Sequence, residues 1–375
     1  MFPKHSADDY LIFRPDDVDL SRSPLRGGFD DETYVLGAFN PGLARLPNGN
    51  LLLMVRVAEA LRHPVVDGQI RAVRWCAPGE WALDAWPVET VDARDPRKFM
   101  IGGAHRVMAL TSLSWLLPVE LSADARQVVA VHYDRAIAPT TTYQQYGIED
   151  ARITLVEGTY YMTACAVSAE RHSTVLYTSS NGLDYELQGI ILDHQNKDML
   201  FFEGKVDGAF WALTRPLGDL YFAYPPGSDY LPGPSINLAR SPDGLHWKPV
   251  DAPGIRPRRT STSSRKIGGG AQPILTDAGW LVLYHGVEAS GLVGVYRTFW
   301  AILDRDDPTR ILRLEDETPL LSPSAELTEP IKHQMYLDGV VFTTGILDAG
   351  EHYLLASGEA DLACRITRMP KGRFA

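Results

Sequence analysis

The sequence predicts an all-β protein, a five-bladed β-propeller in which residues 1–375 form a single domain. Three observations lead to this prediction. A hairpin pattern recurs five times along the chain. The 8 Trp, 16 Tyr, 32 Gly and 26 Pro residues suit many strands joined by many turns. Helical periodicity of the apolar residues is weak throughout.

Each repeat consists of a short apolar strand, a tight turn with glycine and a second strand rich in aromatic and aliphatic residues. Asn-Gly, Glu-Gly and Asp-Gly turns between such runs are typical of hairpins. Two further turns, SSNG from Ser179 and SPDG from Ser241, are predicted to be outer hairpins of the same blades. The repeats begin at Phe39, Glu149, Asp198, Gly269 and Gly339, with turn glycines Gly49, Gly158, Gly208, Gly279 and Gly350.

The spacing of the turn glycines supports a propeller. They lie 109, 50, 71 and 71 residues apart, which fits blades of about 40–50 residues lengthened by insertions. The long first interval is one enlarged blade or a blade with an insertion, which includes residues 61–135. A β-sandwich, which also has many short strands, is the alternative, but a repeat of whole hairpins favours the propeller.

The overall composition argues against several classes of partner. The net charge of −11 and the pI of about 5.4 disfavour nucleic acid and anionic membranes. Cys76, Cys165 and Cys364 are far apart in apolar stretches, so neither a disulfide framework nor a zinc site is expected. The His-containing stretches lack metal-binding spacing, so no metal is expected. With no apolar signal core and no membrane-length run, we expect a cytoplasmic protein.

Polar residues recur at matching positions in the repeats. In a propeller the inner strands line a central channel, so matching positions converge on one site. Basic or imidazole side chains follow the turn glycines by six or seven residues, and polar ones precede them by eight to ten. The first set is Arg56, Arg215 and His285, and the second is Asn40, Asp150 and Asp198.

This set of residues suits a sugar and a small anion. Guanidinium groups bind phosphate or carboxylate in a fork, and Asp and Asn suit sugar hydroxyls. Asp150 lies in the sequence Glu149-Asp150-Ala151-Arg152. Since strand residues alternate between faces, we expect only one of the two acids to face the channel. Burial is expected to raise the pKa of that acid and make it a proton donor near neutral pH.

The balance of acids and bases favours phosphorolysis over hydrolysis. Most glycosidases need two carboxylates, whereas only Asp150 has a distinctive position at the head of an inner strand. Phosphate is already a nucleophile and needs a basic pocket rather than a general base. Asp198, Glu203 and Asp361 remain candidates for a second channel acid.

Several motifs, in order along the chain from about Phe39 to about Asp361, resemble glycoside hydrolase family 130, the β-mannoside phosphorylases and related mannosidases. GIEDARIT at 147–154 is similar to the family signature GxEDPRIT. The stretches NKDMLFFEGKVDGAFWALTRP from Asn196, KIGGGAQPILTDAGWLVLYHGV from Lys266, YRTFWAILDRDDPTRIL from Tyr296 and DGVVFTTG from Asp338 resemble further family segments.

The resemblance implies a five-bladed propeller and an inverting phosphorylase that uses inorganic phosphate as co-substrate, with no other cofactor. It implies that Asp150 is the general acid, whose proton travels through a mannosyl hydroxyl, and that the product is α-mannose 1-phosphate. Oligosaccharide and phosphate are then the binding partners, and a homo-oligomer is possible by analogy. The implied sugar-binding residues are Asn40, Arg56, Asp198, Tyr296 and Asp361, and the implied phosphate-binding residues are Asn196, Lys197, Arg215 and His285.

Departures from the family pattern leave the acceptor sugar and linkage open. Ala151 stands where the family has Pro, and Thr214 stands where it has His. Two alternatives to a phosphorylase are an inverting β-mannosidase and, from another class, a non-catalytic sugar-binding propeller. The basic Ser/Thr-rich loop at 256–266 is either a solvated loop or a lid over the anion site. The glycines at 268–270 are expected to permit close backbone approach near the channel.

Overall fold

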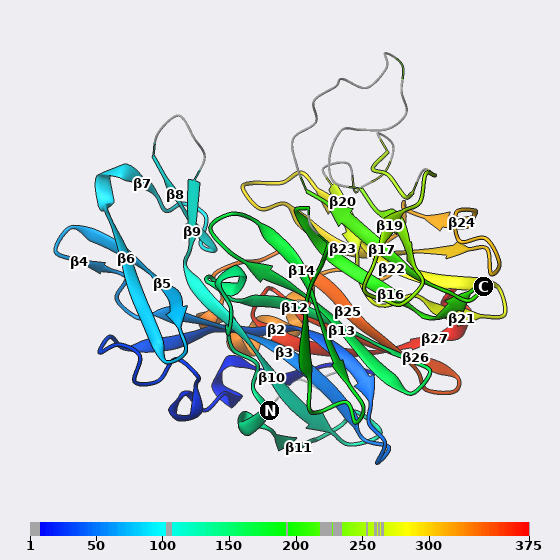
Figure 1. The fold of residues 1–375 in the computed structure, drawn as a ribbon, viewed down its shortest axis with the longest axis horizontal. Coiled ribbons are helices and arrows are strands. Elements are labelled where there is room, and N and C mark those ends of the chain that lie inside the picture. Colours follow the sequence, from blue (N-terminus) through cyan, green and yellow to red (C-terminus); the bar gives the residue numbers. More distant parts are fainter. Residues whose placement is uncertain are drawn as a thin grey trace.

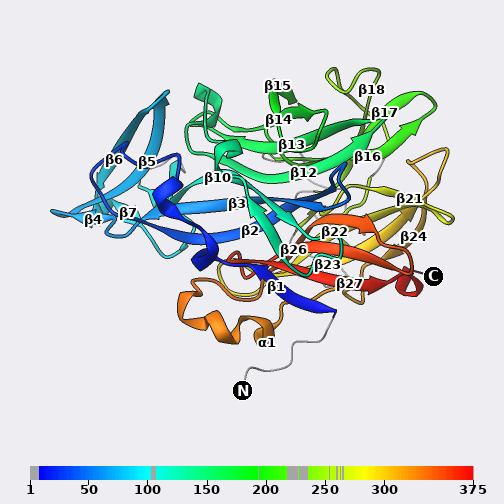
Figure 2. The same ribbon diagram turned by 90° about the horizontal axis from the view of Figure 1, so that it is seen from below.

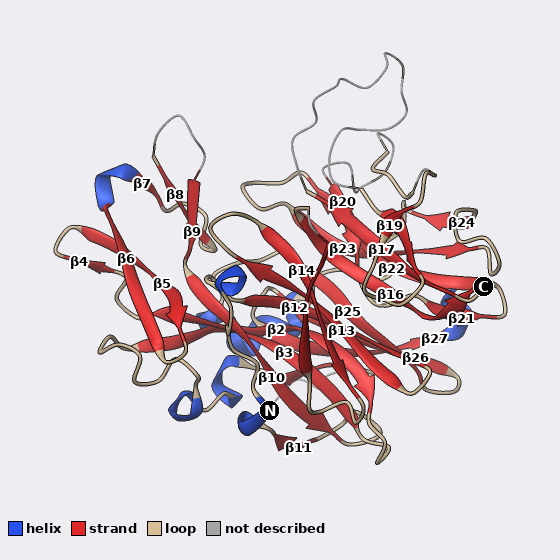
Figure 3. Ribbon diagram, viewed as in Figure 1, coloured by secondary structure: helices blue, strands red, loops and turns tan. Residues whose placement is uncertain are grey.

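The computed structural model describes residues 8–374 except 103–106, 193, 218–226, 228–234, 253, 259–260, 262 and 264–265. The protein is almost entirely β-structure, as Figure 3 shows, which confirms the predicted class. In the described residues the α-helical content is one turn, α1 (Ala325–Thr328). No helix in those residues has the length and apolarity needed to cross a membrane.

Five antiparallel sheets of four or five strands make up the body of the molecule (Figure 1). In chain order, the first three contain β2 (Thr33–Arg45), β3 (Leu51–Leu61), β10 (Ser112–Leu121) and β11 (Val128–Val131); β12 (Ile148–Val156), β13 (Thr159–Val167), β14 (His172–Ser179) and β15 (Glu186–Leu192); and β16 (Asn196–Val206), β17 (Ala209–Pro216), β18 (Asn237–Ser241) and β19 (Lys248–Pro249). The fourth contains β20 (Lys266–Gly269), β21 (Ile274–Thr276), β22 (Gly279–Glu288), β23 (Val295–Leu303) and β24 (Ile311–Glu315).

The fifth sheet joins the two ends of the chain. It contains β25 (Val341–Asp348), β26 (His352–Glu359) and β27 (Ala363–Pro370), and its outer strand is β1 (Asp9–Phe13). Figure 2 shows the N-terminal strand β1 beside β27, the last strand of the chain. We refer to the five sheets by their first strands as the β2, β12, β16, β20 and β25 sheets.

The predicted hairpins are all present. Gly49, Gly158, Gly208 and Gly350 lie in the turn between the two strands of their hairpin, and Gly279 begins the second strand of its hairpin, β22. At two turns both central residues have positive φ, Glu157 at 49° with Gly158 at 82° and Asp207 at 50° with Gly208 at 72°. This is the geometry of a type I′ turn, which favours glycine. The two outer hairpins are also present, after β14 and after β18.

The hydrophobic core is divided into clusters that lie between neighbouring sheets. One cluster joins the β25 and β2 sheets, and the next ones join β2 to β12, β12 to β16, β16 to β20, and β20 back to β25. The first strands β25, β2, β12, β16 and β20 contact one another in this order, and the β20 sheet meets β25 through its strands β22 and β23. This arrangement differs from the alternative of two stacked sheets, in which one core lies between two faces.

The long interval between the turn glycines Gly49 and Gly158 contains an insertion within the β2 sheet, which was one of the two expected arrangements. In the sequence this insertion lies between β3 and β10. It forms two small three-stranded sheets, which project to one side in Figure 1. They consist of β4 (Val65–Val66), β5 (Gln69–Ala77) and β6 (Glu80–Pro87), and of β7 (Val91–Asp92), β8 (Lys98–Ile101) and β9 (Val107–Leu110).

Candidate active site

Three inner strands carry the same irregularity at the predicted polar positions. The register shifts between Phe39 and Gly42, between Glu149 and Arg152, and between Lys197 and Leu200. At each shift the first bulged residue is left-handed, with φ of 48° at Asn40, 53° at Asp150 and 56° at Asp198. Asn and Asp tolerate this conformation better than most residues. Such bulges redirect side chains, and all three side chains line one cavity.

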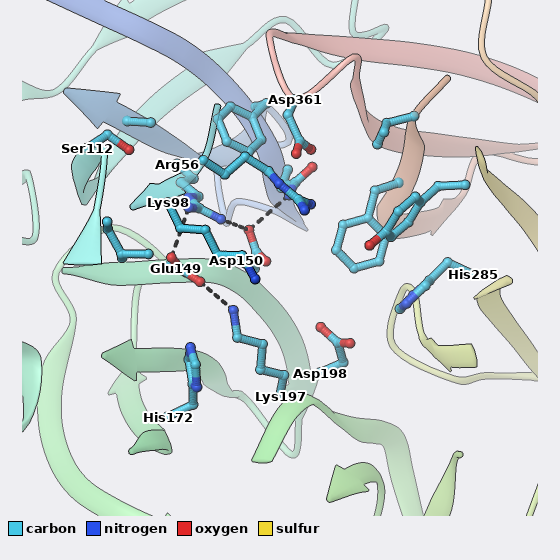
Figure 4. A pocket seen from close by; sticks show the side chains of 18 of the residues that line it. Arg56, Lys98, Ser112, Glu149, Asp150, His172, Lys197, Asp198, His285 and Asp361 are labelled. Atoms are coloured by element: carbon cyan, nitrogen blue, oxygen red, sulfur yellow. Dashed lines mark hydrogen bonds and ion pairs between the residues drawn. The ribbon is translucent and has the colours of Figure 1, made fainter. Parts of the chain in front are cut away.

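The cavity has a volume of about 400 Å³. Of the ten predicted site residues, nine line it: Asn40, Arg56, Asp150, Lys197, Asp198, Arg215, His285, Tyr296 and Asp361. Figure 4 shows several of them directed toward a common space. Counting positions from the turn glycines therefore located residues that converge in the fold.

Asp150 is held by hydrogen bonds from two sides. Asn40 Nδ2 donates to Oδ1 at 2.9 Å and Arg56 Nη1 donates to the same oxygen at 3.0 Å. Burial acts to raise the pKa of Asp150, but the positive charges of Arg56 and Arg152 outweigh it and leave that pKa below its usual value. The expectation of a raised pKa was therefore wrong for the ligand-free protein, because it considered burial without the two guanidinium groups.

Glu149 forms an ion pair with Arg56, the same arginine that contacts Asp150. Arg56 Nη2 lies 2.9 Å from Glu149 Oε1, and Lys197 Nζ lies 2.7 Å from Oε2. The expectation that only one acid faces the channel was wrong, since both line the cavity. The left-handed bulge at Asp150 breaks the strand alternation on which that expectation relied.

A second group of charges lies across the cavity. Asp198 contacts Arg152 Nη2 at 3.1 Å and Arg215 Nε at 3.0 Å. Arg215 Nη1 lies 3.3 Å from His285 Nε2. Since arginine can only donate, Nε2 accepts and the ring proton is on Nδ1. Burial lowers the pKa of His285 to about 3, so the ring is neutral.

Buried Nδ1 of His285 has no hydrogen-bond partner among the described residues. It is therefore a donor available to a ligand. Backbone packs closely here, because a Cβ on Gly268 would lie 2.5 Å from His285 and 2.7 Å from Arg215. The expected close approach of the glycine-rich stretch is confirmed at this position.

Asn196 lies behind the cavity wall. Its amide is fully buried, donates to Thr174 Oγ1 at 2.8 Å and accepts from the Arg215 backbone N–H at 3.0 Å. These contacts fix the start of β16 against the end of β17. The structure thus places Asn196 where it positions Arg215, and it does not bring the amide to the cavity surface.

Several lining residues were not identified from the sequence. Lys266 lies over the Tyr296 ring at 5.1 Å, and burial lowers its pKa. Its position in the KIGGG stretch was the available signal. The other missed residues, which include Arg97, Lys98, Met108, Ser112, His172 and Tyr336, come from the insertion or from positions without a repeat pattern.

The basic loop at 256–266 is only partly described. Arg258 pairs with Asp316 of the segment after β24, which fixes this part of the loop to the β20 sheet. Arg259 and Arg265 lie outside the described residues, so the lid interpretation stays a prediction. Of the candidate second acids, Asp198 and Asp361 line the cavity, and Glu203 is not among its lining residues.

Comparison with known proteins gives the family. The sequence profile of glycoside hydrolase family 130, described as beta-1,4-mannooligosaccharide phosphorylase, matches residues 113–372. A beta-1,2-mannobiose phosphorylase from Listeria innocua is 33% identical over 355 residues, which cover 91% of this chain and 90% of that protein. A 1,2-beta-oligomannan phosphorylase from Thermoanaerobacter sp. is 29% identical over 56% of this chain and 64% of its own length.

A solved structure agrees with the sequence comparison. The beta-1,2-mannobiose phosphorylase from Listeria innocua, in complex with beta-1,2-mannobiose, superposes with a TM-score of 0.78 and 29% identity and covers 97% of both chains. The profile match spans more than half of the chain, and the first relative spans nearly all of it. This chain is therefore an enzyme that belongs to glycoside hydrolase family 130, and the relatives compared above are β-mannoside phosphorylases.

Proposed function

We propose that the enzyme is an inverting phosphorylase that cleaves a β-mannoside with inorganic phosphate and releases α-mannose 1-phosphate, with Asp150 as the general acid. The observation that carries this proposal is the pairing of charges in the cavity. Asp150 lines the cavity together with a cluster of Arg215, His285 and Lys266, and the carboxylate that contacts this cluster, Asp198, is paired with Arg152 and Arg215.

The charges favour an anion. The described lining residues include six Lys or Arg side chains and four Asp or Glu side chains, in a protein whose net charge is −11. A phosphate dianion suits such a local excess of positive charge. Arg215, Lys266 and the free Nδ1–H of His285 provide donors of the kind that phosphate oxygens accept.

Asp150 is ionised in the ligand-free enzyme because its pKa is lowered. A bound phosphate offsets the positive field of the cavity, raises the pKa of Asp150 and so allows it to hold a proton. In the reaction a phosphate oxygen forms a bond to the anomeric carbon as the glycosidic C–O bond breaks. The proton from Asp150 reaches the leaving oxygen, and the proton of hydrogen phosphate restores Asp150, so protons balance over the cycle.

Hydrolysis on the same scaffold is the second candidate. A hydrolase needs a carboxylate base for water. Asp361 is the cavity acid with no ion pair among the described residues, and burial raises its pKa to about 6. The other three cavity acids contact arginine or lysine, which argues against their acting as bases.

The same proposal includes the architecture. We infer that the five sheets form one five-bladed propeller and that residues 1–375 are a single domain. The closed order of sheet-to-sheet core clusters and the pairing of β1 with β27 support this inference. A common cavity at the first strands then corresponds to the axial site of a propeller.

A panel of β-linked mannosides incubated with and without phosphate tests the function. Mannose and mannose 1-phosphate are quantified, and the anomer is assigned by NMR. We expect α-mannose 1-phosphate only when phosphate is present, with potassium chloride at equal ionic strength as the control. Release of free mannose at the same rate without phosphate would overturn phosphorolysis in favour of hydrolysis.

A further inference from the structure

One end of the cavity is lined by residues that have no role in the proposed proton transfer by Asp150 or in the proposed phosphate-binding cluster of Arg215, His285 and Lys266. Met108 and Leu110 belong to β9 of the insertion, Ser112 begins β10 and His172 begins β14. We propose that these four residues form the subsite for the leaving sugar, which is also the acceptor in the reverse reaction. This inference rests on the proposed inverting phosphorolysis and adds the residues that select the acceptor.

The stereochemistry fixes where the leaving group must lie. In an inverting reaction the nucleophile attacks the face of the anomeric carbon opposite the leaving oxygen. Of the residues implied for phosphate, Lys197 is paired with Glu149 of the β12 sheet. The other donors suited to phosphate come from the β16 and β20 sheets, namely Arg215 from the first and Lys266 and His285 from the second. The leaving sugar therefore belongs on the opposite side of Asp150.

The unassigned residues lie on that opposite side. Ser112 and His172 come from the β2 and β12 sheets, which neighbour each other in the closed order, and the β20 sheet borders neither of them. Figure 4 shows His285 on one side of Asp150 and both Ser112 and His172 on the other. The β8–β9 hairpin reaches the same region, since Lys98 and Leu110 pair across it and both line the cavity.

The chemistry of this end suits a sugar ring. Met108 is 46% exposed at the cavity wall and, with Leu110, offers an apolar surface for a ring face. The charge of Lys197 together with burial lowers the pKa of His172 to about 4, so its ring is neutral and offers one donor and one acceptor. No side-chain hydrogen bond of His172 exists within the described residues, so both ring nitrogens are available to hydroxyl groups.

The test uses the full chain in the reverse direction, with α-mannose 1-phosphate as donor and a panel of monosaccharide acceptors, and measures released phosphate. We expect M108A and H172A each to raise the KM for the acceptor about tenfold, the effect of one lost contact. The KM for α-mannose 1-phosphate should change less than twofold. H172Q retains a donor and an acceptor and should restore the acceptor KM to within about threefold of the parent value.

Val107 supplies the matched control. It precedes Met108 on β9 and is 52% exposed, but it is not among the cavity-lining residues. V107A should therefore leave both constants unchanged. If M108A and H172A leave the acceptor KM unchanged, or raise the KM of α-mannose 1-phosphate equally, the subsite assignment is wrong. If the parent enzyme shows no acceptor-dependent phosphate release, it is the proposed function that fails.

Discussion

At the scale of single residues, Arg56 connects the charges of the site. One guanidinium contacts both Glu149 and Asp150, and Glu149 in turn contacts Lys197. Removal of one member of a buried ion pair leaves an uncompensated charge and costs about 3–5 kcal/mol. Substitutions that keep shape and hydrogen bonding while changing charge are therefore the informative ones here.

The substitution D150N tests the general acid. An asparagine retains an oxygen that accepts from Asn40 and Arg56, so the fold should persist, but it supplies no proton. We expect kcat to fall by about 10²–10⁴-fold, the usual contribution of a positioned acid. Steady-state phosphorolysis of the best mannoside measures it. The control E157Q lies in the exposed turn after the same strand and should be neutral, and near-parental turnover of D150N would exclude Asp150 as the acid.

The substitution R215A tests the proposed binding of phosphate by the cluster of Arg215, His285 and Lys266. Asp198 keeps Arg152 as a partner, so loss of Arg215 removes a phosphate donor without leaving that acid unpaired. We expect the KM for phosphate to rise about tenfold to a hundredfold, the range for hydrogen bonds to charged groups. Initial rates at varied phosphate give this value, with R240A on the exposed face of β18 as the control. An unchanged phosphate KM would remove Arg215 from the phosphate site.

At the scale of elements, the bulges of the inner strands position the polar side chains. The bulge of β2 also depends on its neighbour β26, because Asn40 Oδ1 lies only 1.9 Å from where a Cβ on Gly358 would be. The Asn40 backbone nitrogen is 2.9 Å from the same point. Glycine at 358 is therefore required for β26 to pack against the bulge that carries Asn40.

The substitution G358A tests this packing. The added methyl must displace Asn40 from Asp150, so we expect kcat/KM to fall at least tenfold, together with a lower Tm. Matched against it, G372A adds a methyl with no atom within 4 Å and no positive φ. Mannoside phosphorolysis and thermal denaturation of both variants give the comparison. Equal activity of G358A and G372A would contradict the proposed role of this contact.

The sequence predicted these elements well where a residue pattern repeats. The turn glycines located all five hairpins, and counting from them located Asn40, Asp150 and Asp198. Strand alternation failed at Glu149 because a bulge depends on the whole sheet and leaves no clear local pattern. Met108 was missed because the insertion reaches the cavity through tertiary packing alone, and His172 was missed because its position at the start of β14 has no counterpart in the repeat pattern.

At the scale of the whole molecule, burial of neutral histidines links stability to pH. Burial lowers the pKa of His285 to about 3, and the charge of Lys197 with burial lowers that of His172 to about 4. An unfolded histidine titrates near 6.5. Below that value the unfolded chain binds protons that the folded chain does not, so these two groups make the free energy of unfolding fall as pH falls.

Asp361 has the opposite effect on the free energy of unfolding over part of this pH range. Its pKa is raised by burial to about 6, whereas an unfolded aspartate titrates near 3.9. The folded chain therefore binds more protons than the unfolded chain between about pH 6 and pH 4, and this group favours folding as pH falls there. Glu203, whose pKa burial raises to about 7, acts in the same direction as Asp361, so two buried carboxyls oppose the two histidines.

Thermal denaturation between pH 7.5 and pH 4.5 tests this balance. Below about pH 6.5, the unfolded-state value for histidine, we expect the Tm of the parent enzyme to follow the balance of the histidine and carboxyl titrations. In H172Q one of the two histidine titrations that lower stability at acid pH is absent, so the Tm of this variant should fall less steeply on acidification than that of the parent. In D361N one of the two compensating carboxyls is absent, so its Tm should fall more steeply than that of the parent. The two variants thus change the slope of the Tm against pH in opposite directions. A purely structural effect would instead shift the Tm equally at every pH. Parallel curves for all three proteins would show that neither group governs the acid response.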